Sequence, residues 1–439
     1  MGRTPPSNIT VFSLFLCTAA LTGCAAIRYE ARPLSPKHSA AAFAGRRLDP
    51  AVGRWSESAL VRHVLAGHPD IALAKARVAT ARAAVETANT KPNPTAGFSP
   101  VIAANPNGAT SPWAFGFTLD VPVETAGKRA RRADVALAAV QAAALDAATA
   151  AFQTGDAVRH AFRDLAASTA RVELLTKQQQ AQEEVVKLYD DRVAGGAIAR
   201  AETTQSRLLL QQTRVLVRDA EKKRAEARAA LAGAAGVPVE ALDRVSFDFS
   251  SFDQPPAAGS AGQARAHALQ NRTDLLSALA AYAGAEATLR LEVAKQYPDI
   301  HLTPGYQYDQ GTHKWSLPGL TAALPIFDRN RGPVMEAVAK RAEAGAAFVA
   351  LQAKVSGEVD RALAALNGSR AKLAEAEKLV AEQHRQQQSV SEQQKAGAAD
   401  KLTLASTTVE LHAAELARLE SLAESHQAAL DLARATQSP

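Results

Sequence analysis

Residues 299–309 read DIHLTPGYQYD, and residues 113–123 read WAFGFTLDVPV. Apolar or aromatic side chains alternate with small or polar ones in both stretches, which is the period of a β-strand with one apolar face. The apolar series of the second stretch is Trp113, Phe115, Phe117, Leu119, Val121 and Val123. The sequence therefore predicts amphipathic strands.

The composition of the whole chain favours helices instead. Hydrophobic residues make up 47% of the 439 residues, but aromatic residues make up only 5% and alanine supplies much of the rest. Such a chain packs helices through small side chains rather than around an aromatic core. The net charge of +6 is modest for this length, and we expect a solvated surface of both signs and no nucleic-acid partner.

Proline leaves two long windows empty, residues 123–237 and 334–438. A proline inside a helix costs ~3 kcal/mol, so long helices are possible only in these windows. We expect one helix over residues 128–192 and another that begins at Pro333 and ends near Lys395. At ~1.5 Å per residue, each would approach 100 Å.

A glycine turn follows each predicted long helix, and a leucine-bearing helix returns from it. The turns are Gly195-Gly196 and Gly397. The leucines of the two returning helices are Leu208, Leu209, Leu216 and Leu231, and Leu404, Leu411, Leu416 and Leu422. We expect two antiparallel coiled-coil hairpins.

The two halves of the chain are a tandem duplication. Asp70 and Asp274 are 204 residues apart, Pro122 and Pro325 are 203 apart, and Gly127 is paired with Gly332. This period is too long for a solenoid repeat, so each half is one unit of helix, strand hairpin and helix hairpin. The predicted segments are a signal peptide (1–23), an extended tether (24–54), the first repeat (55–236), a connector (237–263) and the second repeat (264–436). The predicted strands lie near residues 95–104, 113–123, 299–309 and 314–325.

The N-terminus carries an apolar run that ends in Leu21-Thr22-Gly23-Cys24. The run is too short to span a bilayer but has the length of a signal-peptide core. The four residues resemble a bacterial lipobox, in which Cys24 would be acylated, for example with palmitate. An ordinary signal peptide with a chance cysteine is the alternative, and both predict export. The only other cysteine, Cys17, lies within the leader, so no disulfide is expected.

The predicted strands have the length that a tilted strand needs to cross a bilayer. Four aromatic residues in them are candidates for anchoring at the membrane interface: Trp113, Trp315, Tyr306 and Tyr308. Hairpins packed on soluble helices are the alternative. Four strands are too few to close a membrane barrel, so membrane strands would require an oligomer. Pro100 and Pro304 predict bulges or early strand ends.

Together these segments resemble the outer-membrane efflux proteins, or TolC-like outer-membrane factors. The resemblance rests on PNPTAGFSP and YPDIHLTPGYQYD at the strands, on LDVPVETAGKRARR and AALPIFDRNRG at the junctions into the long helices, and on the duplication. It implies a fold that is mainly α with membrane β, in which a homotrimer forms a β-barrel of about twelve strands continued by an α-helical tunnel. It also implies an outer-membrane location, a periplasmic adaptor protein and an inner-membrane pump.

The resemblance assigns roles to two sets of residues. Pro122, Gly127, Pro325 and Gly332 would form the junctions between strands and helices. The residues expected to contact the adaptor at the helical tips are Gly195, Gly196, Ala197, Glu202, Gly397, Ala398 and Asp400. Thr403 and Ser406 stand where some relatives carry tip acids, so selective cation gating at the tip is not expected.

The segments LPIFDRNRG and GKRARR look most like the branch of the family that partners heavy-metal pumps. The sequence itself offers no metal-ligand cluster, because the ten histidines show no HxxxH or HExxH spacing and Met335 is the only methionine besides Met1. His301 and His313 fall in one predicted hairpin and would lie near one another there, but ordinary surface histidines are the favoured interpretation. The conduit would then be passive, with no cofactor or resident metal.

Proteins with other functions also have long helical hairpins or the same channel architecture, so alternatives to a heavy-metal channel stay open. Multidrug efflux and type I secretion channels share this architecture, and a periplasmic coiled-coil adaptor is a further alternative. An adaptor would need one hairpin and a separate β-rich domain, whereas this chain has two hairpins. An enzyme is not expected, since the chain has no GxSxG motif and no phosphate-binding loop.

Overall fold

The computed structural model describes residues 28–49, 53–102, 104, 112–257 and 261–437. The chain divides into two compact units, residues 1–46 and 47–439. The first contains helix α2 (Pro36–Ala44), which begins where the Ser35 hydroxyl accepts a hydrogen bond from the His38 N–H (3.4 Å). Pro36 at the first helical position and the alanines that follow favour this helix. The prediction of an extended tether is therefore wrong for these nine residues.

The second unit contains two copies of one arrangement. The first copy is α4 (Pro69–Asn89), β2 (Thr95–Ile102), β3 (Trp113–Val123), α5 (Lys128–Ala194) and α6 (Thr204–Ala235). The second is α8 (Thr273–Ala294), β5 (Ile300–Asp309), β6 (Thr312–Ala322), α9 (Arg331–Lys395) and α10 (Lys401–Thr436). Helix α3 (Glu57–Gly67) precedes the first copy, and α7 (Ala261–Asn271) precedes the second.

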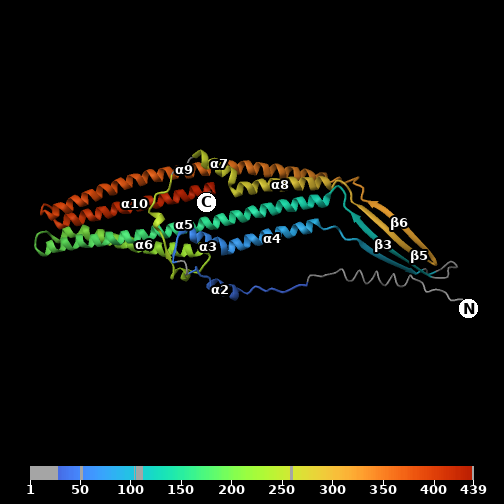
Figure 1. Ribbon diagram of the computed structural model, residues 1–439, viewed down its shortest axis with the longest axis horizontal. Helices are drawn as coiled ribbons and strands as arrows, with labels where there is room; N and C mark the ends of the chain where they lie inside the picture. Colours follow the sequence, from blue (N-terminus) through green and yellow to red (C-terminus); the bar gives the residue numbers. More distant parts are fainter. Residues whose placement is uncertain (1–27, 50–52, 103, 105–111, 258–260, 438–439) are drawn as a thin grey trace. The chain divides into compact units, whose positions relative to one another are not determined.

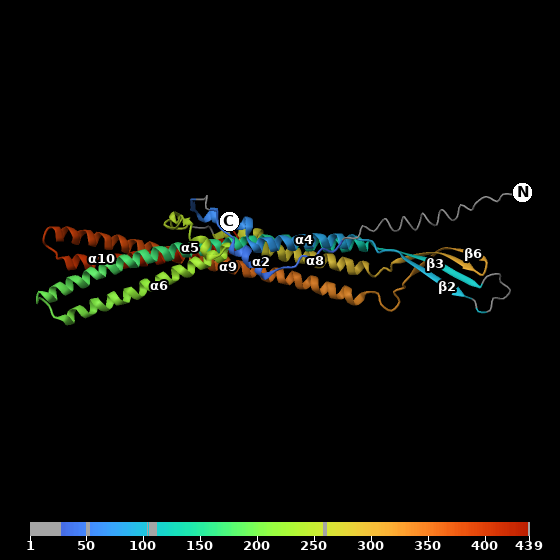
Figure 2. The ribbon, with the colours of Figure 1, turned by 90° about the horizontal axis from the view of Figure 1, so that it is seen from below.

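The strands and the helical turns of this unit lie at opposite ends of it. In Figure 1 the four strands lie at one end, and the turns from α5 to α6 and from α9 to α10 lie at the other. Helices α5 and α9 have 67 and 65 residues and run between these ends. Figure 2 shows the α5–α6 hairpin and the α9–α10 hairpin as two separate pairs.

Each long helix is preceded by a residue in the left-handed conformation. The sequence comparison of the two repeats identified the one before α5 but not the one before α9. Gly127, before α5, has φ 69°, and Asn330, before α9, has φ 56°. These residues are 203 apart, the same displacement as between Pro122 and Pro325. The structural counterpart of Gly127 is therefore Asn330, and the predicted pairing of Gly127 with Gly332 is wrong. Asparagine also tolerates the left-handed conformation, so the second repeat does not need a glycine here. Gly332 and Pro333 lie inside the first turn of α9.

The four long strands form one antiparallel sheet in the order β2-β3-β5-β6. Strand β2 ends two residues before the predicted limit, and β6 begins and ends earlier than predicted, so Pro325 lies outside it. The β5–β6 register shifts between Thr303 and Gly305, at Pro304, as expected for a strand proline. Pro100 makes no bulge, because it pairs with Phe115 in regular register, and β2 ends two residues after it at Ile102.

The core lies where the connector between the repeats crosses the helices. Phe162 of α5 is 1% exposed and Leu231 of α6 is fully buried. The connector adds β4 (Ser246–Phe247), which pairs in parallel with β1 (Arg54–Trp55), and the short turns η2 (Val239–Leu242) and η3 (Ser250–Phe252). Elsewhere the helices pack through leucines and valines, such as Leu366 and Val359, together with buried alanines at 166, 220, 362 and 414.

Candidate functional site

One face of the sheet is apolar from edge to edge. Phe115 and Phe117 of β3 lie opposite Tyr308 and Tyr306 of β5, and Tyr306 lies opposite Trp315 of β6. The rings are in contact, with centroids 5.0 Å apart for Phe115 and Tyr308 and 4.8 Å apart for Tyr306 and Trp315. Several of these side chains are exposed in the single chain, up to 80% for Trp315. No other part of the chain that the structure describes covers this face.

The predicted interface aromatics gather in one part of that face. Trp113 begins β3, Tyr306 and Tyr308 lie near the end of β5, and Trp315 lies near the start of β6. Because the strands are antiparallel, these positions meet at the end of the sheet that holds the β5–β6 turn. The hydroxyl of Tyr306 also bonds the Nδ1 atom of His313 (2.5 Å).

The other face of the sheet is polar. His301 Nδ1 lies 3.0 Å from Asp120 Oδ1, and Lys314 Nζ donates to Asp309 Oδ2 (2.9 Å). His301 pairs with Pro122 and Thr321, whereas His313 pairs with Tyr308. The two histidines therefore lie on opposite faces, and the prediction that they lie near one another is wrong. A hairpin brings residues together only when their register and face agree.

Polar contacts fix the junction between the strands and the first long helix. Asp299, just before β5, accepts hydrogen bonds from the Thr125 N–H (2.9 Å) and Lys128 Nζ (2.8 Å). Burial alone would raise the pKa of the Asp299 carboxyl, but the Lys128 and Thr125 contacts outweigh it and lower the pKa. Sequence reasoning missed Asp299 and Lys128, because residues 171 apart carry no local signal for contact.

The helical tips contain all seven residues expected there. Gly196 and Gly397 adopt left-handed φ values of 71° and 78°, which glycine allows without strain. The N–H groups of Ala197 and Ala398 then bond carbonyls of the preceding helix, as in a helix-ending turn. Glu202 accepts a hydrogen bond from the Ala199 N–H (3.2 Å) in η1 (Arg200–Thr203).

Asp400 connects the two tips. It precedes α10, accepts from the N–H and the hydroxyl of Thr403 (both 2.7 Å), and pairs with Arg192 at the end of α5. The Thr403 bonds and the Arg192 charge lower the pKa of the Asp400 carboxyl to about 2. Both oxygens are thus engaged, and the carboxylate acts as a helix cap and a link between hairpins.

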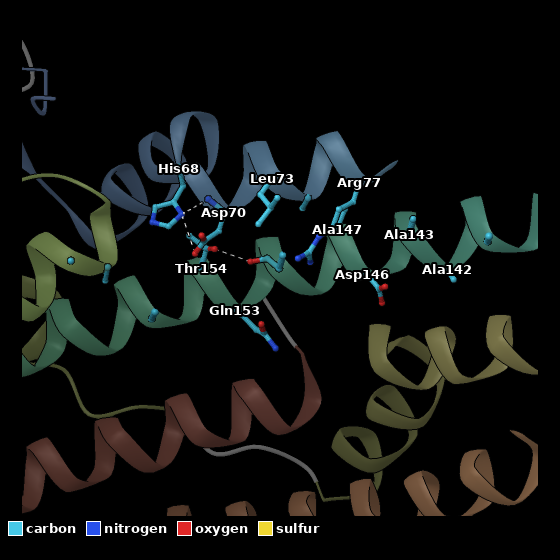
Figure 3. A pocket seen from close by; sticks show the side chains of 16 residues that line it. His68, Asp70, Leu73, Arg77, Ala142, Ala143, Asp146, Ala147, Gln153 and Thr154 are labelled. Atoms are coloured by element: carbon cyan, nitrogen blue, oxygen red, sulfur yellow. Dashed lines mark hydrogen bonds and ion pairs between the residues drawn. The ribbon is translucent and has the colours of Figure 1, made fainter. Parts of the chain in front are cut away.

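A groove of about 650 Å³ lies between α4 and α5, next to the end of α6 (Figure 3). Half of its lining residues are alanines, including Ala142, Ala143 and Ala147. His68 caps α4 by accepting from the Asp70 N–H (3.2 Å). These polar groups complete the start of a helix and form no nucleophile–base pair.

A second cavity, of about 730 Å³, lies between α5 of the first repeat and helices α8, α9 and α10 of the second repeat. It is lined by the start of α8 and the end of α10, and it is rich in charge. Arg272 bonds both oxygens of Asp274 (3.0 and 2.6 Å), Glu358 (2.7 Å) and the Ala435 carbonyl (2.9 Å). Arg434 pairs with Asp156 (2.7 Å). The charges are paired internally, as in a structural ion cluster.

In the ranges that the structure describes, no group of three or more His, Cys, Asp or Glu side chains is arranged to hold a metal ion. Cys24, the predicted acylation site, lies outside those ranges.

Residues 60–237 and 265–437 match the family described as outer membrane efflux protein. The chain belongs to that family. One curated relative is the cobalt-zinc-cadmium resistance protein CzcC of Cupriavidus metallidurans, 24% identical over 257 residues, which are 58% of this chain and 60% of the relative. The match thus spans less than two thirds of that relative's length.

Solved structures of this efflux family's fold superpose over most of the chain. A membrane protein from Pseudomonas aeruginosa matches with a TM-score of 0.70 and 22% identity, covering 94% of this chain and 99% of that one. The outer membrane protein VceC from Vibrio cholerae matches with a TM-score of 0.69 and 18% identity, covering 87% and 95%. The chain thus shares the family of the outer membrane efflux proteins and the fold of these solved membrane proteins.

Proposed function

We propose that the chain is the outer-membrane channel of a tripartite efflux system and that three copies form it. The observation that carries this proposal is the four-stranded sheet with one apolar face, one polar face and two unpaired edge strands, β2 and β6. Backbone groups at an open edge have no partner in lipid, so the strands can cross a bilayer only in a closed barrel. Three sheets of four strands, joined edge to edge, give about twelve strands.

The uncovered apolar surface of the helices supports assembly. Helix α5 contains an 18-residue window with mean hydropathy 1.6, of which 6% is buried in the single chain. Leu208, Leu209 and Leu216 of α6 are each more than 40% exposed. Neighbouring protomers would cover such surfaces and extend the barrel as a helical tunnel. The tip residues, including Gly196, Gly397 and Asp400, would then meet a periplasmic adaptor coupled to an inner-membrane pump.

The proposed cargo is heavy-metal cations. The CzcC relative is named for cobalt, zinc and cadmium resistance, and the junction segments resemble the heavy-metal branch. The channel would be passive, so selectivity would lie in the pump. The lipid anchor at Cys24 belongs to the same proposal, and Cys24→Ser would abolish incorporation of labelled palmitate.

The test of the barrel uses two adjacent β6 residues on opposite faces. Leu320→Lys places a charge on the apolar face, which costs ~2–4 kcal/mol at the bilayer midplane and less toward the interfaces. We expect it to deplete heat-modifiable trimer from outer-membrane fractions. The matched control, Thr321→Lys, places the same charge on the polar face and should assemble normally. Equal assembly of both variants, or a soluble monomer in the wild type, would contradict the proposal.

The test of the cargo measures growth of a deletion strain. Loss of the gene should lower tolerance to zinc, cobalt, cadmium or copper, and the wild-type gene should restore it. Unchanged metal tolerance together with lost drug tolerance would instead identify a multidrug channel. Loss of an exported protein alone would identify a type I secretion channel.

A further inference from the structure

The polar face of the sheet carries one histidine–carboxylate pair that joins the two repeats. His301 of β5 lies diagonally across from Asp120 of β3, since His301 pairs with Pro122. Its Nδ1 atom lies 3.0 Å from Asp120 Oδ1 and 3.1 Å from Oδ2. The two side chains are 41% and 39% exposed, so both reach solvent on this face.

This geometry fixes the chemistry of the imidazole. A carboxylate only accepts hydrogen bonds, so Nδ1 carries the ring proton and donates a hydrogen bond to Asp120. In the neutral ring, Nε2 then holds a free lone pair. No hydrogen bond or ion pair reaches Nε2 from the residues that the structure describes. Metal-binding histidines in proteins show the same arrangement, in which a carboxylate orients the ring and raises its basicity.

We propose that His301, positioned by Asp120, is an exchangeable ligand for divalent cations that favour nitrogen, such as zinc, cadmium or cobalt, inside the barrel. The inference rests on the proposed channel, because only a closed barrel turns the polar face into its interior. The nearby Asp299 carboxylate accepts its bonds from Lys128 and Thr125 through Oδ1. A single imidazole binds weakly, which suits a conduit whose sites must release what they bind.

The first experiment protects the imidazole from chemical modification. Purified trimer is treated with diethylpyrocarbonate, which modifies free imidazole nitrogen, in CdCl2 or MgCl2, and modified peptides are quantified by mass spectrometry. We expect Cd²⁺ but not Mg²⁺ to protect His301, because Mg²⁺ prefers oxygen ligands. His313, on the apolar face of the same sheet, is the internal control and should be unaffected by either metal.

Variants of Asp120 separate positioning from folding. Asp120→Ala should raise the CdCl2 concentration that half-protects His301 about tenfold. Asp120→Asn, whose amide oxygen still accepts from Nδ1, should restore part of the protection. Both variants should still form heat-modifiable trimer. Equal protection of His301 and His313, or unchanged protection in Asp120→Ala, would overturn the inference.

A second experiment measures the channel itself. Trimers in planar bilayers should carry a potassium current that CdCl2 reduces, and His301→Ala should remove that sensitivity while His313→Ala keeps it. A wild-type current that ignores Cd²⁺ would refute the metal contact alone. Absence of both trimer and current would refute the proposed channel instead, so the two failures are distinct.

Discussion

The two repeats begin their shorter helices at the same backbone position but with different chemistry. In the first repeat Pro69 begins α4 and has no N–H to satisfy, and Gly236, the left-handed residue that ends α6, has no side chain. In the second repeat Thr273 begins α8, and its N–H donates to Oε1 of Gln437 (2.6 Å), the left-handed residue that ends α10. In the first repeat, Pro69 has no N–H that needs an acceptor, and in the second repeat the side chain of Gln437 accepts from the Thr273 N–H. The same backbone position is therefore satisfied by different residues in the two repeats.

The residue before each helix shows the same contrast. His68 caps α4 as a neutral acceptor and lies against Gly236. Arg272, 204 residues later, is buried among Asp274, Glu358 and a carbonyl. Burial alone would raise the pKa of the Asp274 carboxyl, but the Arg272 guanidinium outweighs it and holds the pKa below its ordinary value. One repeat thus relies on close packing and the other on charge.

The largest expected effect is that of Arg272→Ala. Removing the guanidinium leaves two partly buried carboxylates and a carbonyl without their donor, which should cost about 3 kcal/mol of unfolding free energy. The counterpart, His68→Ala, removes a helix cap and the packing contact with Gly236 but leaves no buried charge without its partner, so it should cost less, about 1 kcal/mol. Thermal unfolding followed by circular dichroism, at equal protomer concentration, compares them. Equal losses would contradict the contrast between the repeats.

Gly236→Ala should have the next largest effect, about 2 kcal/mol. The position has φ 67°, and an added Cβ would lie 2.9 Å from Cδ2 of His68. Gly233→Ala, one turn earlier in α6, is the matched control, because a Cβ there meets nothing within 4 Å. That control should leave stability unchanged or raise it by up to about 1 kcal/mol. The same unfolding measurement distinguishes steric conflict from a general intolerance of alanine.

Substitutions of Gln437 should have smaller effects. Gln437→Ala loses the bond to the Thr273 N–H and keeps the left-handed conformation (φ 50°), so it should cost about 1 kcal/mol. Gln437→Gly loses the same bond but relieves the backbone, and it should be close to neutral. If Gln437→Gly lowers the unfolding free energy as much as Gln437→Ala does, the left-handed backbone at this position does not cost stability.

The smallest expected difference between the repeats is in how their aspartates, Asp274 and Asp70, make the stability of the protein depend on pH. Asp274 has a lowered pKa in the folded chain, so its contribution to stability is complete above the ordinary value of about 3.8. The contribution is lost as the pH falls from that value through the folded one. Asp274→Asn should therefore flatten the loss of stability as the pH falls below about 4. Asp70→Asn, at the 70% exposed counterpart, should leave that slope unchanged.

Local patterns in the sequence were sufficient for much of the architecture. Period-two alternation identified the strands, and the empty proline windows identified helices that extend to Ala194 and Lys395. Local signals fail where different residues satisfy one backbone requirement, as Asn330 does in place of a glycine. They also fail in residues 323–330, where apolar character continues after β6 has ended.

The contacts that define the candidate sites were beyond such patterns. Asp120 and His301 are 181 residues apart, and Thr273 and Gln437 are 164 apart. Alternation places a side chain on a face but does not specify which strand lies next to it. Only the order β2-β3-β5-β6 and its register bring residues of different repeats together.

The unpaired edges of β2 and β6 have a consequence for how cells make this protein. In the proposed trimeric barrel, a lone protomer could not enter the hydrocarbon without exposing unpaired amide groups, so insertion would wait for two other copies and its rate should rise steeply with the concentration of chains. A protomer with a mutation that prevents pairing at the edge of β2 or β6 would still assemble with wild-type protomers into trimers that cannot close. With equal amounts of sound and damaged copies, random mixing would leave about one eighth of trimers intact, and such an allele would be dominant.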